Sequence, residues 1–193
     1  MRAKVFVVVI LMSCGFGMIS VFPKTRSAQA RPSKEVFTGT VVGMGPGGNL
    51  VSRGFTLTIE GYTSDVDARK FAGILKSQGE DALLKAISKE KKGTFVLDGQ
   101  IGHDINTVRV HQNPNGRTYT IVFERWLSFF EVRYGTRSED YPFTYIELFI
   151  DETKGMGGTL LAAAKIRFNK QNVIEIENFG IYPAQLMGVR RQN

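Results

Sequence analysis

The sequence predicts a mainly β protein: an antiparallel β-barrel or curved sandwich of about eight strands, with a two-helix insertion. Apolar and polar residues alternate along several segments, as expected for strands with one buried face. Turn-forming glycines, prolines and asparagines separate these segments at hairpin spacing. Only between about residues 64 and 92 do apolar residues recur every three or four positions, which indicates helices.

The first 30 residues have the order of a secretory signal peptide. A basic start at Arg2 and Lys4 precedes an apolar run at 5–22, and an A-x-A sequence at 28–30 offers a cleavage site. We therefore expect an exported protein, periplasmic or extracellular. Two alternatives stay open: a lipoprotein anchored through Cys14, at the end of a lipobox-like stretch, and an uncleaved apolar run kept as a membrane anchor.

The remaining part, residues 31–193, has the size of a single domain. Cys14 is the only cysteine of the chain, so cleavage would exclude a disulfide framework, a cysteine nucleophile and a thiolate metal site. The formal charge of +7 becomes +3 without the leader, because 21 basic residues then face 18 acidic ones. We therefore expect no nucleic-acid partner, no cofactor, no metal and no membrane span in the mature chain.

Two strands, at about residues 36–43 and 55–59, flank a glycine-rich stretch at 43–48. These glycines resemble a phosphate-binding loop, but such a loop needs a helix immediately behind it. Because a second alternating strand follows instead, we interpret the glycines as a hairpin loop.

The helical insertion begins at Ser64, where a hydroxyl group can cap the first turn. Asp65 and Asp67 suit a metal pair, but we interpret them as the acidic residues that favour a helix start. Gly79 separates two short helices, which we expect to cover one face or one end of the sheet. Their apolar stripes are Ala68, Phe71, Ile74 and Leu75, then Leu83, Leu84 and Ile87.

After the helices, a short strand at 94–97 and a turn around Asp98 lead to His103 and Asp104. One histidine beside one aspartate is a weak catalytic signal, because a nucleophile is still needed. We interpret His103 as a solvated turn residue.

A hairpin follows at 108–111 and 118–123, with Asn-Pro-Asn-Gly at 113–116 predicting a four-residue loop. Its register places Val110 opposite Tyr119 and Val108 opposite Ile121. Arg109 then lies on the other face.

The end of the chain predicts a strand at 143–151, a glycine-rich loop at 154–158, and a hairpin at 160–168 and 173–178. Apolar and ionic pairing agree on one register for this hairpin, with a solvated outer face. A closing strand at 184–190 follows Pro183 and can pair with the first strand. The expected pairs are Phe168 with Ile174, Ile166 with Ile176, Arg167 with Glu175, and Lys165 with Glu177.

The stretch at 124–147 concentrates aromatic and charged side chains and holds the only tryptophan. Two interpretations compete: a recognition loop carried on rigid strands, and ordinary core with surface ion pairs. The candidate ligand or partner surface comprises Trp126, Phe129, Glu131, Arg133, Arg137, Asp140, Tyr141, Tyr145 and Glu147.

Within this stretch, Ser-Phe-Phe-Glu-Val-Arg at 128–133 and Arg-Ser-Glu-Asp-Tyr-Pro-Phe-Thr-Tyr-Ile-Glu at 137–147 carry a resemblance. The chain resembles a group of uncharacterised exported bacterial proteins over about residues 81–191, including Asn-Phe-Gly-Ile-Tyr-Pro at 178–183 and Val-Arg-Arg at 189–191. The resemblance implies export, and it brings no activity, cofactor or catalytic residue.

These observations favour an exported, non-catalytic binding or envelope-interaction module for a small apolar or amphipathic ligand, or for a protein partner. A carboxylate-based hydrolase is one alternative, with Glu131 and either Glu147 or Asp140 as acid and base beside Arg133 or Arg137. The other alternative is a purely structural envelope protein whose aromatic stretch is core.

Overall fold

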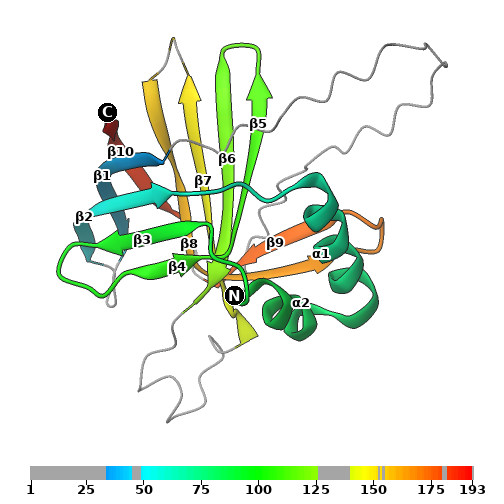
Figure 1. Ribbon diagram of the computed structural model, residues 1–193. Coiled ribbons are helices and arrows are strands. Elements are labelled where there is room, and N and C mark those ends of the chain that lie inside the picture. Colours follow the sequence, from blue (N-terminus) through cyan, green and yellow to red (C-terminus); the bar gives the residue numbers. More distant parts are fainter. Residues whose placement is uncertain are drawn as a thin grey trace, which may run out of the picture.

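The computed structural model describes residues 34–44, 49–125, 140–151, 153, 155–179 and 182–192, and it shows a nearly closed antiparallel barrel with two helices inserted between β2 and β3 (Figure 1). The strands are β1 (Glu35–Met44), β2 (Leu50–Ile59), β3 (Gly93–Leu97), β4 (His103–Ile105), β5 (Thr107–Asn113), β6 (Gly116–Glu124), β7 (Phe143–Asp151), β8 (Gly155–Phe168), β9 (Ile174–Asn178) and β10 (Ala184–Gln192). The helices are α1 (Asp65–Gln78) and α2 (Glu80–Ile87).

The strand order is β4-β3-β2-β1-β10-β8-β7-β6-β5, with β9 paired to β8. The two ends of this order, β4 and β5, are joined at Asn106, whose buried amide bonds the Glu90 carbonyl and the Glu124 N–H. Beyond this corner, the Thr63 N–H donates to the Val108 carbonyl at 2.8 Å, and the Val108 N–H donates to the Thr63 hydroxyl at 3.0 Å. These bonds nearly close the barrel.

The predicted fold class is confirmed, with ten strands among the described residues where about eight were expected. The closing strand pairs with β1, as predicted. Both predicted hairpin registers are also confirmed: Val110 faces Tyr119 between β5 and β6, and Phe168 faces Ile174 between β8 and β9. Alternating apolar residues therefore carried enough information to set these registers.

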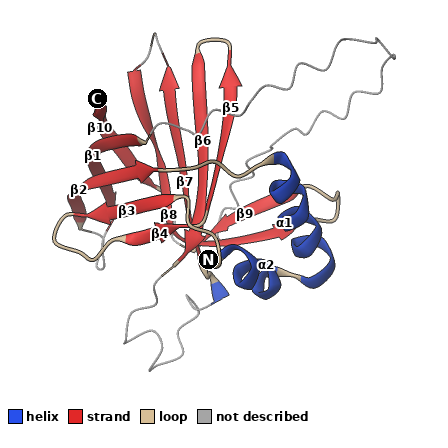
Figure 2. Cartoon of the chain, in the orientation of Figure 1, coloured by secondary structure: helices blue, strands red, loops and turns tan. Residues whose placement is uncertain are grey.

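Two hydrophobic clusters divide the molecule. The first fills the barrel with side chains from β1 to β8 and β10; among them are Phe37, Leu57, Phe95, Ile121 and Leu148. The second lies outside the barrel, between the helices and the outer face of β7, β8 and β9. Figure 2 shows both helices on the same side of the strands, beside β9. As a result, residues at the start of β7 are buried on both faces.

The helices dock through apolar stripes and one polar anchor. The Ser64 hydroxyl accepts the Asp67 N–H at 3.0 Å and caps α1, as the sequence predicted. At the start of α2, the Glu80 carboxylate accepts the Ile166 N–H of β8 at 2.6 Å. β7 pairs with β8 only as far as Ala164, so Glu80 bonds a strand N–H beyond that pairing.

Several local expectations were wrong. His103 lies in strand β4 and is half-buried, packed 6.0 Å from the Phe123 ring centroid, so it is not a solvated turn residue. Asn113 pairs with Gly116, which shortens the predicted four-residue loop to two residues. Strand β8 already begins at Gly155, inside the predicted glycine-rich loop.

Candidate functional site: a pocket between the helices and the barrel

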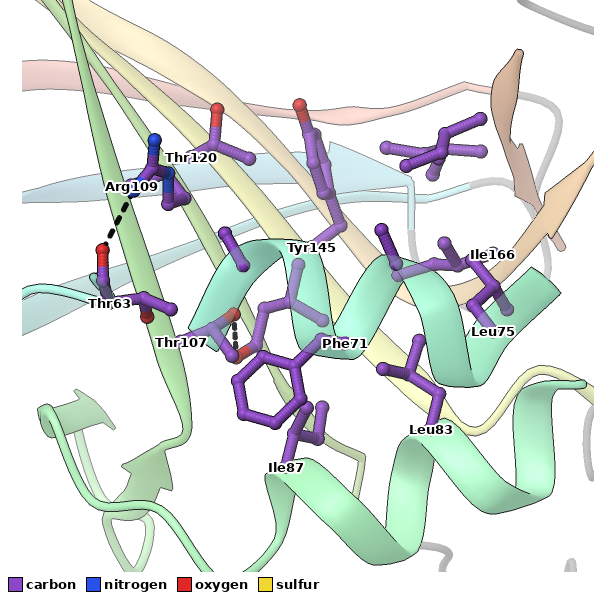
Figure 3. Close-up of a pocket in the computed structure, with 15 residues that line it drawn as sticks. Thr63, Phe71, Leu75, Leu83, Ile87, Thr107, Arg109, Thr120, Tyr145 and Ile166 are labelled. Carbon is purple, nitrogen blue, oxygen red and sulfur yellow. Dashed lines mark hydrogen bonds between the residues drawn. The ribbon is translucent and has the colours of Figure 1, made fainter. Parts of the chain in front are cut away.

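A pocket lies in the second cluster and has a volume of about 170 Å³. Its walls come from both helices, from β5 to β9 and from the segment before α1 (Figure 3). The lining is almost entirely apolar. It comprises Thr63, Ala68, Phe71, Ala72, Leu75, Leu83, Ile87, Thr107, Arg109, Thr120, Val122, Tyr145, Ile166, Ile174 and Ile176.

The pocket exists because small and large residues meet where the helices cross the sheet. Ala68 and Ala72 lie one turn apart on α1 and put only methyl groups toward the strands. Val122 and Tyr145 are paired across β6 and β7 and form part of the opposite wall. The alanines leave space that leucines at the same positions would occupy.

Polar groups gather at one side of the pocket. Figure 3 shows Arg109, Thr120 and the Tyr145 hydroxyl on this side, opposite Phe71 and Ile87. Their grouping follows from the sheet, because Arg109 of β5 pairs with Thr120 of β6. Arg109 on this side is partly solvated, since its side chain is 43% exposed.

The Arg109 guanidinium is already held by the start of α1. It donates to the Thr63 carbonyl at 2.8 Å and to the Asp65 carboxylate at 2.6 Å. The hydrogen bond from Arg109 lowers the pKa of Asp65 below its usual value, and the arginine charge adds to this effect. The charge of Arg109 is therefore balanced by Asp65, and the pair anchors α1 to the barrel.

Tyr145 is the exceptional polar residue of the pocket. Its side chain is 2% exposed, and its hydroxyl forms no hydrogen bond of acceptable geometry with the described residues. Burial raises the pKa of the phenol well above 10, and the Glu147 charge adds to the rise. The nearby Thr120 side chain partly counteracts this rise in the pKa of Tyr145. The two side chains nevertheless do not meet in the geometry of a hydrogen bond. A buried hydroxyl without a partner costs about 1–3 kcal/mol.

Glu147 lies beside this polar side, two residues beyond Tyr145 on the same face of β7. It pairs with Thr120 of β6 and Thr159 of β8, so two threonines flank it. Its side chain is half-buried, and desolvation raises the pKa of its carboxyl above the usual value. Among the described residues no hydrogen bond or ion pair of Glu147 is found.

Four of the nine predicted surface residues are described by the structure. Tyr145 lines the pocket, and Glu147 follows it on the same face of β7 without lining the pocket. The Tyr141 hydroxyl donates to Glu177 at 2.6 Å, its ring packs on Phe179, and the residue is 8% exposed. Asp140 is exposed. Outside the described residues lie Trp126, Phe129, Glu131, Arg133 and Arg137.

Both predicted pairs of catalytic acids include Glu131, which lies outside the described residues. Of the two alternative partners of Glu131, Glu147 lies in strand β7 and Asp140 precedes that strand.

A second polar cluster lies inside the barrel around Glu35, which is 3% exposed. Its carboxylate accepts hydrogen bonds from the hydroxyl groups of Tyr62 at 2.6 Å and Tyr119 at 3.0 Å. It also forms ion pairs with Arg191 at 2.8 Å and Arg117 at 3.7 Å. Burial, and to a smaller extent the hydrogen bond to Glu35, raises the pKa of Tyr62 to about 12. Each Glu35 oxygen has a partner, so this cluster ties strands together.

Sequence reasoning missed Arg109, Thr120 and the apolar wall of the pocket as site residues. The predicted register did place Arg109 on the face opposite Val110, and the predicted helical stripes included Phe71 and Leu75. The missing information was that the helices dock over this face, which depends on Glu80 and on long-range packing.

In the part of the chain that the structure describes, no group of three or more His, Cys, Asp and Glu side chains is arranged to hold a metal. No helix in the same residues has both the length and the apolar character required to cross a bilayer. Compared with family models, curated proteins and solved structures, the chain matches none of them.

Proposed function

We propose that this protein is an exported, non-catalytic binding module whose ligand is a small amphipathic molecule held between the helices and β7. The observation that carries the proposal is the Tyr145 hydroxyl: a deeply buried polar group, without a hydrogen-bond partner among the described residues, in an otherwise apolar pocket. The phenol can both donate and accept a hydrogen bond, so a ligand that bonds it in either direction offsets the cost of burying that hydroxyl.

The size and lining of the pocket define the ligand. A cavity of about 150 Å³ lined by Leu, Ile and Phe stays dry and holds a benzene-sized molecule. This pocket is similar in volume and in its aliphatic and aromatic walls. Its polar side, next to Arg109 and Thr120, accommodates one polar group. The expected ligand therefore has an apolar body of about six to ten heavy atoms and one polar end.

The signal-peptide pattern of residues 1–30 and the resemblance to exported proteins support the exported location in this proposal.

Titration calorimetry with 2-phenylethanol tests the binding proposal. We expect a dissociation constant on the order of 1 mM, typical of ligands with so few heavy atoms. Ala72→Phe places a ring inside the pocket and should abolish the heat of binding. Val66→Phe is the matched control, because Val66 lies on α1 but is 67% exposed and outside the lining. Equal binding by Ala72→Phe and the wild type would refute the proposal.

A further inference from the structure

Next to the polar side of the pocket, although not in its lining, lies an unbalanced negative charge. Arg109 and Asp65 neutralise one another at 2.6 Å. Glu147, two residues from Tyr145, has no ion-pair partner among the described residues, although its side chain is half-buried. A carboxylate partly removed from water without a cation is destabilising in the empty protein.

The strand register brings Glu147 to the Tyr145 hydroxyl. Thr120 lies directly opposite Glu147 in the β6–β7 ladder, and Figure 3 shows the Tyr145 hydroxyl on the Thr120 side of the pocket. The side chains of Tyr145 and Glu147 lie on one face of β7, with Cα atoms about 6.6 Å apart. A polar group of the ligand that reaches the Tyr145 hydroxyl therefore also lies close to Glu147.

We propose that the ligand is an amphipathic cation, whose apolar body fills the pocket and whose ammonium group pairs with Glu147. This inference rests on the proposed function and specifies the ligand's charge. Glu147 supplies the opposite charge, and the Asp65 carboxylate offsets the repulsion from Arg109.

Three probes with the same phenyl body and different polar ends test this inference: 2-phenylethylamine, 2-phenylethanol and phenylacetate. With the full chain at neutral pH, purified without detergent because detergent can occupy an apolar pocket, we expect the amine to bind about tenfold more tightly than the alcohol. Phenylacetate should bind most weakly. Added salt should weaken amine binding and leave alcohol binding unchanged.

Glu147→Gln keeps the shape of the side chain and removes its charge. It should reduce amine affinity about tenfold, to the level of the alcohol, and leave alcohol affinity unaltered. Glu60→Gln, at an exposed residue outside the pocket lining, controls for the change in net charge and should alter neither affinity.

Tightest binding of phenylacetate, equal binding of amine and alcohol, or an unchanged amine preference in Glu147→Gln would each overturn the inference. In all three cases the pocket still binds the phenyl body, so the proposed function survives. If none of the probes binds, the proposed function itself fails, and the inference fails with it.

Discussion

The hydroxyl of Tyr119 donates a 3.0 Å hydrogen bond to the carboxylate of Glu35 inside the barrel, joining residues 84 positions apart in the chain. Tyr62 and Arg191 bond the same carboxylate, so one buried side chain connects β1, β6, β10 and the segment before α1. This arrangement makes Glu35 the main polar tie of the barrel.

Glu35→Ala should strongly destabilise the fold, because it leaves two tyrosine hydroxyls and an arginine without their acceptor. We expect the free energy of unfolding to fall by about 3–5 kcal/mol, measured by urea denaturation. Glu35→Gln keeps an acceptor oxygen and should lower the free energy of unfolding by less than Glu35→Ala does. A loss below about 1 kcal/mol in Glu35→Ala would show that the cluster adds little to stability.

Tyr145→Phe should have opposite effects on stability and binding. Removing a buried hydroxyl without a partner should raise the free energy of unfolding by about 1 kcal/mol. The same change should weaken 2-phenylethanol binding several-fold, because the ligand loses a hydrogen bond. A fall in stability would contradict this account, since it would mean that the hydroxyl is bonded in the empty protein.

Glu147 should make stability depend on pH. Its folded-state pKa is raised by burial, so the folded protein holds this proton more tightly than the unfolded chain. The resulting stabilisation is present at low pH and is lost as pH rises through the folded-state pKa. Glu147→Gln should therefore unfold at a higher temperature than the wild type at pH 7.

The gain in Glu147→Gln should be at most about 1 kcal/mol, because the side chain stays partly solvated. The difference between the variants should disappear below about pH 4, where the glutamate is neutral in both states. Thermal unfolding from pH 3.5 to 8 measures this. A difference that is constant with pH would show that Glu147 does not experience desolvation.

Gly73 lies within α1 and is exposed, and a Cβ atom added there meets no atom within 4 Å. Gly73→Ala should raise the free energy of unfolding by about 0.5–1 kcal/mol, because alanine lowers the entropy of the unfolded chain. Gly79→Ala is the matched control: it also has space, but its φ of 85° disfavours alanine and should cause a loss. A gain in both variants would contradict the helix boundary at Gly79.

Local patterns predicted most of the scaffold. The hairpin of β8 and β9 could be aligned because Phe168 with Ile174 and Arg167 with Glu175 require the same register. Ser64 marked the start of α1 through its hydroxyl and the following acidic residues. Strand β4 was missed because it has only three residues, too few for a visible alternation.

The candidate site was predicted only in part. Tyr145 and Glu147 were singled out by their setting in an aromatic and charged stretch; Tyr145 lines the pocket, and Glu147 lies two residues further along the same face of β7. Arg109 could not be assigned to this site from sequence, because its neighbours Thr63 and Asp65 are 46 and 44 residues away. The role of Glu35 was invisible for the same reason, since its partners are all distant in sequence.

The most direct test of the central claim is a methyl NMR titration with 2-phenylethanol, which locates the ligand residue by residue. We expect chemical-shift changes at the pocket methyls of Leu75, Leu83, Ile87, Ile166 and Ile176. We expect none at the barrel-interior methyls of Ile121 and Leu148. The same titration of Ala72→Phe should leave the pocket methyls unshifted. Shifts confined to the barrel interior, or no shifts up to about 10 mM ligand, would contradict a ligand site between the helices and β7.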